Sequence, residues 1–134
     1  MASIGSQSYQ EFDIYAIETS SNGKSSSLLK ELFPDVNFFP YQGNLGFAVG
    51  NNFLAKQAIQ DGADYLFVLN SDMELSPNTL EVFVNYFATY KDLGVIGSTL
   101  LIGDNEKIQL FGVKANFKTQ NKKFLFPNQN VNEV

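Results

Sequence analysis

The chain has 134 residues, about one domain, and its net charge of −5 argues against a protein that binds the phosphate backbone of nucleic acids. It contains neither cysteine nor histidine, which excludes disulfides, thiolate nucleophiles and cysteine-type zinc sites and leaves acid–base chemistry to carboxylates. No apolar run approaches the ~20 residues of a membrane span, and the first residues lack the features of a signal peptide, so a cytoplasmic chain is expected.

Apolar residues recur in two patterns, which together predict strands that alternate with helices. Short aromatic and branched runs indicate strands, and apolar residues three to four positions apart indicate helical faces. In chain order the expected elements are a strand at 12–17, a helix from Ser25 or Ser26 to Phe33, a strand at 36–39, a helix that leaves a glycine-rich turn at 43–52 and ends near Gln60, a strand at 65–69, a helix that Ser76 caps and Pro77 begins, a strand at 94–97, and a hairpin of 98–102 with 107–111. Residues 1–11 are predicted as a flexible lead-in or the end of a helix, and the polar tail 114–134 as ordered only in part.

This alternation predicts an α/β fold class. Strands joined by helices form a mostly parallel, doubly wound sheet that resembles a Rossmann fold, with helices on both faces and right-handed crossovers. A C-terminal β-hairpin follows. Neither a repeat nor a linker interrupts residues 1–134, which are expected to form a single domain.

The stretch 65–74 is the centre of the predicted function. Five apolar residues, 65–69, end abruptly in Asn70, Ser71 and Asp72. A run that is apolar on both faces predicts a strand buried under helices, and open α/β sheets bind ligands at the carboxyl ends of such strands. Oxygen ligands at this place suit Mg²⁺ or Mn²⁺. The alternative is a loop whose polar side chains only make turn hydrogen bonds.

Three predicted loops should open on the same edge of the sheet. Residues 18–25 offer a carboxylate and hydroxyls, and residues 70–74 offer the candidate metal site. Residues 43–50 offer glycines, backbone N–H groups and a helix N-terminus, which attracts phosphate. Together the loops describe a pocket for a phosphorylated ligand held through a divalent cation. Taken singly, the glycines can equally serve a tight turn, and Glu18 can be a solvated loop residue.

Three segments, in this order, are similar to motifs of one enzyme family. Residues 44–52 read Asn-Leu-Gly-Phe-Ala-Val-Gly-Asn-Asn, close to an Asn-Leu-Gly-Phe-Ala-x-Gly-Asn-Asn signature. Residues 69–72 read Leu-Asn-Ser-Asp, which resembles the Leu-Asn-Pro-Asp form of a DxD motif. Residues 16–25 lie where the family has Val-Asp-Asn-x-Ser-x-Asp-x-Ser. Glu18 replaces the first Asp, Thr19 the Asn and Gly23 the second Asp, and both serines match. Over residues 12–113 the chain therefore resembles the family 2 glycosyltransferases of the GT-A fold, in particular their rhamnosyltransferase-like branch.

The resemblance implies a function for the candidate pocket. The family transfers a sugar from a nucleotide-diphosphate sugar to a hydroxyl of a saccharide or lipid-linked acceptor, here in the cytoplasm or at the inner face of the membrane. Asp72 would ligate Mg²⁺ or Mn²⁺ that bridges the diphosphate. The donor-binding residues implied in the same way are Glu18, Ser21, Asn44, Gly46, Asn52 and Asn70.

Two departures from the family pattern limit the expected activity. The family's first strand and helix should precede residue 5, and no segment here matches them. The sequence stops about where the family's acceptor half, which contains the catalytic base, is expected to begin. No residue here matches that base, so no catalytic residue is assigned. The sequence therefore predicts a partial GT-A domain, as a fragment or a degenerate copy. The alternative is a non-catalytic domain that binds a partner, for example a second copy, through an open sheet edge.

Overall fold

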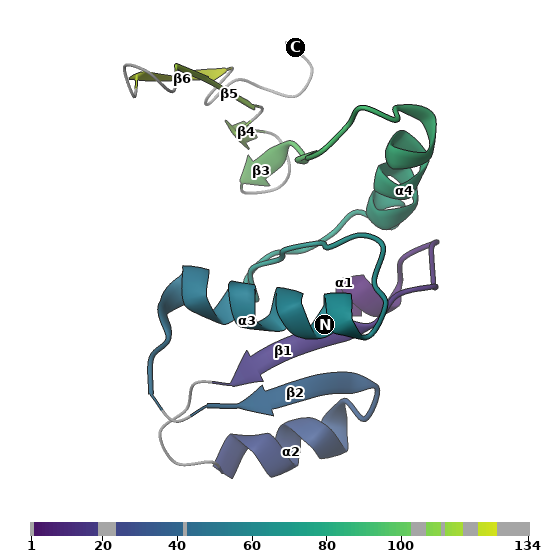
Figure 1. The fold of residues 1–134 in the computed structure, drawn as a ribbon, viewed down its shortest axis with the longest axis vertical. Helices are drawn as coiled ribbons and strands as arrows, with labels where there is room; N and C mark the ends of the chain where they lie inside the picture. The colour runs from purple at the N-terminus through teal and green to yellow at the C-terminus, as the bar shows by residue number, and fades with distance from the viewer. Residues whose placement is uncertain are drawn as a thin grey trace. The chain divides into compact units, whose positions relative to one another are not determined.

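The computed structural model describes residues 2–18, 24–41, 43–102, 107–110, 112–116 and 121–125. Its contacts divide the chain into two compact units, Met1–Val82 and Phe83–Val134, which are taken separately below. The fold is α/β with one small parallel sheet in the first unit (Figure 1). The larger doubly wound sheet and the single-domain organisation stay predictions.

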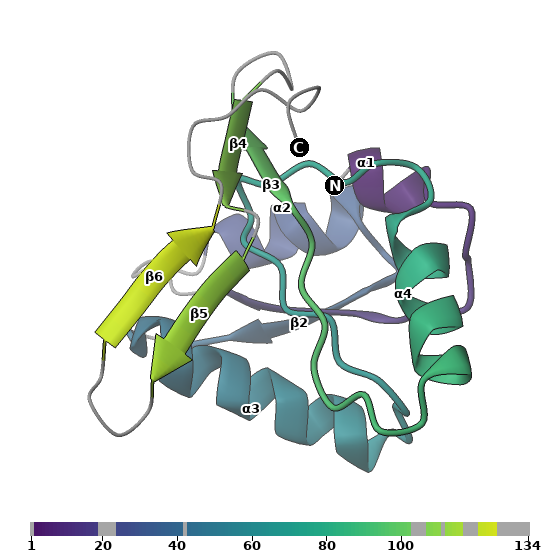
Figure 2. The ribbon, with the colours of Figure 1, turned by 90° about the horizontal axis from the view of Figure 1, so that it is seen from above.

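The first unit is built around two parallel strands. β1 (Ile14–Glu18) pairs with β2 (Val36–Pro40), in a register that runs from Ile14 opposite Val36 to Glu18 opposite Pro40. α2 (Lys24–Leu32) connects them and contacts β2, whereas α3 (Gly46–Gln60) follows β2 and contacts β1. The strands run between the two helices (Figure 2). These four elements confirm the predicted strand–helix alternation over this part of the chain.

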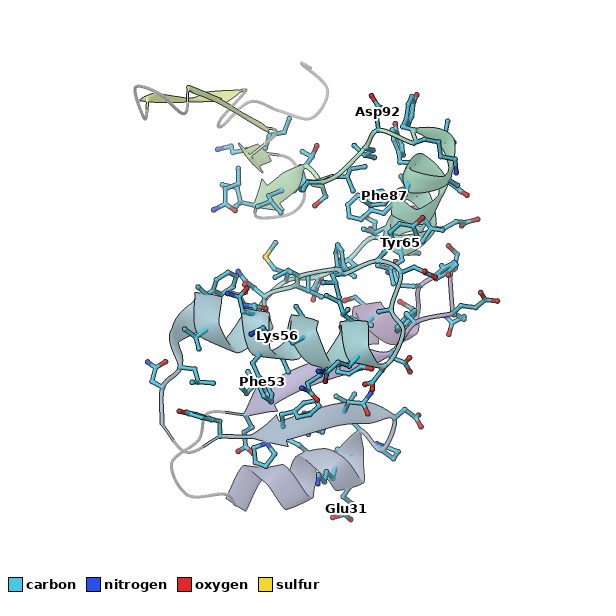
Figure 3. All side chains as sticks on the ribbon, viewed as in Figure 1. Glu31, Phe53, Lys56, Tyr65, Phe87 and Asp92 are labelled. Carbon is cyan, nitrogen blue, oxygen red and sulfur yellow. The ribbon has the colours of Figure 1, made fainter. Side chains whose placement is uncertain are left out.

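A small apolar core holds α3 against the strands. Val36 and Ala58 are buried, and the Phe39 ring makes an edge contact with Phe53, with ring centroids 5.4 Å apart. On its other side Phe39 stacks with Tyr15 at 6.3 Å. Phe53 lies on the side of α3 that faces the strands (Figure 3). Aromatic pairs of this kind add about 0.5–1.5 kcal/mol each to the burial of their surfaces, so the Phe39–Phe53 contact adds to the apolar packing that holds α3 against the strands.

Within the predicted lead-in at residues 1–11, residues 2–5 form a short helix. α1 (Ala2–Gly5) leads to Gln7, and α4 (Thr79–Thr89) starts later than the pattern predicts. Ser76 does not cap α4 with its side chain; instead its carbonyl accepts hydrogen bonds from the N–H and Oγ1 of Thr79. Pro77 and Asn78 therefore form a turn, and the helix begins only after it.

The prediction of a buried strand at 65–69 is wrong for this structure. Residues 65–70 belong to no strand, and the side chains of 65–68 are between 42 and 57% exposed. The strand pairs of the described residues are β1 with β2, β3 with β4, and β5 with β6. An apolar run favours burial, but a strand also needs a neighbouring strand for its backbone hydrogen bonds, and the run itself does not specify one.

The second unit contains two antiparallel pairs. β3 (Leu100–Ile102) pairs with β4 (Lys107–Leu110), which confirms the predicted hairpin, although its connection at 103–106 lies outside the described residues. β5 (Gly112–Asn116) pairs with β6 (Asn121–Leu125), and the polar composition after Lys114 gives no sign of these strands. The predicted strand at 94–97 is absent, because this glycine-flanked segment has no strand partner and leaves Val95 87% exposed.

Candidate functional site

The candidate site lies at the carboxyl ends of β1 and β2. Glu18 ends β1 opposite Pro40, and the next residue, Tyr41, donates its backbone N–H to the Glu18 carbonyl at 2.8 Å. This bond continues the ladder one residue beyond β2. Both strand ends and the first turn of α3 lie on the same side of the pair (Figure 1). Because ligands of open α/β sheets bind at this edge, the strand ends are the natural place for a site.

A glycine turn carries the chain from β2 into α3. Gly43 and Gly46 have φ values of +114° and +69°, which favour residues without a Cβ. Between them, the Asn44 Oδ1 accepts a hydrogen bond from the Gly46 N–H at 2.8 Å. Leu45, the residue before the helix, makes no side-chain cap. The first turn of α3 therefore presents backbone N–H groups and the positive end of the helix dipole at the strand ends.

The second turn of α3 packs closely against β1. Gly50 is buried, and a Cβ built on it would lie 3.6 Å from the Cγ2 of Ile17, the residue before Glu18. Of the predicted residues, Glu18 ends β1, whereas Asn44 and Gly46 lie at the start of α3 and are joined by a hydrogen bond. Asn52 lies in the second turn of α3 and is exposed. Ser21 lies outside the described residues.

Asp72 and Asn70 lie in a separate turn of the same unit. The Met73 N–H donates to the Asn70 carbonyl at 3.2 Å, and both candidate side chains are exposed. Within the described residues, the Asp72 carboxylate makes no hydrogen bond or ion pair. The structure does not connect Asp72 to the glycine turn by any described contact.

The described residues do not assemble a metal site from protein groups alone. No group of three or more acidic residues gathers among them in a way that would hold a cation. A single carboxylate such as Asp72 is enough for Mg²⁺ only where ligand phosphates and water complete the coordination. A cation at Asp72 would therefore need oxygen ligands from a bound diphosphate and from water.

Tyr41 in this region, and a hydrogen-bonded pair at the far ends of β1 and α3, are not found by reading the sequence. Tyr41 has a half-exposed side chain beside the strand ends, and an aromatic residue directly after a strand is a signal that sequence reading can use. At the opposite ends of β1 and α3, the Tyr15 hydroxyl donates to the Asp61 Oδ2 at 2.7 Å. This hydrogen bond, with smaller contributions from burial and from the charges of Asp61 and Asp13, raises the pKa of Tyr15 to about 12. The pair joins the end of α3 to β1.

Comparisons with known proteins give one match. The family model for glycosyl transferase family 2 matches residues 1–131. Neither the curated proteins nor the solved structures contain a match. Among the described helices, none combines the length and the apolar composition that crossing a membrane requires.

Proposed function

Because this chain belongs to glycosyl transferase family 2, we propose that the strand ends and the first turn of α3 bind the diphosphate of a nucleotide sugar. The observation that carries the proposal is the N-terminus of α3, which lies at the carboxyl ends of β1 and β2 (Figure 1). Asn44 accepts the Gly46 N–H, and Leu45 provides no side-chain cap for the N–H groups that follow. Backbone N–H groups and a helix dipole in this arrangement stabilise phosphate oxygens.

Each residue of the proposed site has a distinct task. Gly46 lets the diphosphate approach the backbone closely, since it carries no side chain at the start of the helix. Asn44 and Asn52 offer amide groups to the donor. Glu18 and Ser21 contact the nucleoside. Asp72 and Asn70 hold Mg²⁺ or Mn²⁺ together with the diphosphate.

The proposal covers donor binding and assigns no catalytic base. When bound, the cation would neutralise the charge that grows on the leaving diphosphate. We propose the rhamnosyltransferase-like branch of the family on the basis of the Asn44 to Asn52 segment, and a saccharide or lipid-linked acceptor at the cytoplasmic face of the membrane. The chain then represents the donor-binding portion of such an enzyme.

A thermal shift experiment tests the role of Asp72. The melting temperature is measured with Mn²⁺ and a panel of nucleoside diphosphates, for the unmodified chain and for Asp72→Ala. A ligand at 100 times its Kd stabilises the folded state by about 2.7 kcal/mol, so an increase of several degrees is expected with at least one nucleotide. The increase should require Mn²⁺ and disappear in Asp72→Ala.

Asp35→Ala is the matched control, because Asp35 is an exposed aspartate at the amino end of β2. It should keep the full shift. No shift with any nucleotide at millimolar concentration would contradict donor binding, and a full shift in Asp72→Ala would contradict the proposed metal ligand.

One observation favours a second function, an interaction domain. Among the described strands, β2 is the only one that pairs with β1, so the other edge of β1 has no strand partner there. Residues 65–68 of the same unit expose apolar side chains. Sheet edges and exposed apolar segments are typical places for association. Light scattering after size exclusion separates the two functions: a dimer that binds no nucleotide supports the interaction domain, and a monomer that binds nucleotide disfavours it.

A further inference from the structure

An exposed aromatic residue lies at the edge of the proposed donor site. Tyr41 is the first residue after β2, and its side chain is 44% exposed. Its backbone is held in place, because its N–H donates to the Glu18 carbonyl at 2.8 Å. The tyrosine is therefore fixed beside the end of β1, next to the residue that we assign to the nucleoside.

The Tyr41 ring also lies along the glycine turn. Its Cε1 atom is 3.8 Å from the position that a Cβ on Gly43 would take, and Gly43 has the positive φ that bends the chain toward α3. The edge of the ring thus lies beside the loop that enters the helix, while the backbone of Tyr41 is bonded to the end of β1. A ligand with its diphosphate at the N-terminus of α3 and its nucleoside at Glu18 would pass this ring.

We infer that Tyr41 is the stacking platform for the nucleobase of the nucleotide sugar. This inference rests on the proposed function and adds the residue that binds the base. Every nucleobase has a flat aromatic face, and stacking on aromatic side chains does not depend on hydrogen-bond identity. Tyr41 therefore supplies affinity for a nucleoside diphosphate over inorganic pyrophosphate, and it does not choose between bases.

Phe47 is the competing candidate at this edge. Its side chain is 66% exposed, but it belongs to the first turn of α3. The N–H groups of that turn are the ones assigned to the diphosphate. A nucleobase is separated from its diphosphate by the ribose, so the base should lie away from this turn. Tyr41, beside Glu18, meets this condition better.

Calorimetric titration with two probes tests the inference. Uridine diphosphate and inorganic pyrophosphate are each titrated, with Mg²⁺, into the unmodified chain and into Tyr41→Ala, Tyr41→Phe and Phe47→Ala. In Tyr41→Ala, the Kd for uridine diphosphate should rise about tenfold, as loss of one base–aromatic stack predicts, whereas the Kd for pyrophosphate stays unchanged. Tyr41→Phe keeps the ring and should stay within about twofold of the unmodified chain.

Unchanged binding of pyrophosphate shows that each variant is folded and has an intact diphosphate site. The exposed Tyr90, outside the proposed site, provides the control Tyr90→Ala, which should bind both probes normally. The inference is overturned if Tyr41→Ala binds uridine diphosphate as tightly as the unmodified chain, or if the selective loss occurs in Phe47→Ala instead. Failure of the unmodified chain to bind either probe would reject the proposed function itself, and the role of Tyr41 with it.

Discussion

Gln7 joins the N-terminal segment to the start of α4 through two hydrogen bonds, and a third bonds it to Ser3 within its own segment. Among the described residues, Gln7 is the one polar residue that is buried, with 3% of its surface exposed. Its Nε2 donates to the carbonyls of Ser76 and Ser3 at 2.8 and 2.9 Å, and its Oε1 accepts from the Leu80 N–H at 3.1 Å. One side chain thus satisfies backbone groups of segments that are about seventy residues apart.

Replacement of Gln7 should therefore destabilise the first unit. Gln7→Ala leaves the Ser76 carbonyl and the Leu80 N–H without this partner, at an expected cost of about 1–3 kcal/mol. Urea denaturation followed by circular dichroism measures the change. The exposed Gln60 gives the control, since Gln60→Ala should change the free energy of unfolding by less than about 0.5 kcal/mol. Equal stabilities of the two variants would contradict this role of Gln7.

The hydrogen bond between Tyr15 and Asp61 makes a pH-dependent contribution. The pKa of Tyr15 is about 12 in the folded chain, above the ordinary value of about 10. The contribution to stability is fully present below pH 10 and is lost as the pH rises through about 12. Absorbance at the tyrosinate band, taken as the difference between the unmodified chain and Tyr15→Phe, should give a midpoint near 12.

Asp61→Asn removes the charge of the acceptor and should lower this midpoint. If the difference curve of the unmodified chain instead had its midpoint at the ordinary tyrosine pKa of about 10, the hydrogen bond to Asp61 would not hold Tyr15 in its protonated form. The pair lies at the opposite ends of β1 and α3 from the candidate site, so neither substitution should change nucleotide binding.

At the scale of the element, α3 contains two glycines with opposite requirements. Gly46 has a φ of +69°, a left-handed conformation that costs an L residue about 1–2 kcal/mol. Gly50 is inside the helix, and a Cβ there would make an ordinary contact of 3.6 Å with Ile17. We expect Gly46→Ala to lower the free energy of unfolding, and Gly50→Ala to leave it unchanged or raise it by up to about 1 kcal/mol.

Urea denaturation of the two variants side by side checks this prediction. Both changes add the same methyl group to the same helix, so each controls for the other. If Gly50→Ala destabilised the chain as much as Gly46→Ala, the positive φ at position 46 could not explain why Gly46→Ala lowers the stability.

Elements with a strong local pattern are the ones that the sequence predicts. α3 and the β1–β2 pair follow from periodicity and from glycine and proline boundaries, and the β3–β4 hairpin follows from its turn residues. The segment 65–69 does not form the strand that its apolar run predicts. Periodicity indicates which residues favour burial, but it does not indicate which strand will pair with them. β6, with the sequence Asn-Lys-Lys-Phe-Leu, is missed because it lacks alternation of polar and apolar residues, and β5 is missed because its apolar–polar alternation spans only Val113 to Asn116.

At the scale of the whole molecule, the fold depends on which strands pair with one another over long sequence distances. The boundary between the two compact units falls at Val82 and Phe83, inside α4, where the helical pattern shows no interruption. The candidate site lies wholly in the first unit, since Glu18, the glycine turn and Asp72 all precede Val82. Strand alternation predicts that Glu18 and Gly46 share one end of the sheet, whereas the position of Asp72 depends on the pairing of 65–69, which no local pattern determines.

The central claim is that a nucleoside diphosphate binds at the carboxyl ends of β1 and β2, against the first turn of α3. Amide chemical shifts of the ¹⁵N-labelled chain, titrated with uridine or guanosine diphosphate and Mg²⁺, test it most directly. The largest shifts are expected for Glu18, Tyr41 and residues 43–48, with no change at Ile108 in β4. Saturating nucleotide that leaves the amides of residues 43–48 unmoved, or that shifts mainly residues of the second unit, would contradict the account.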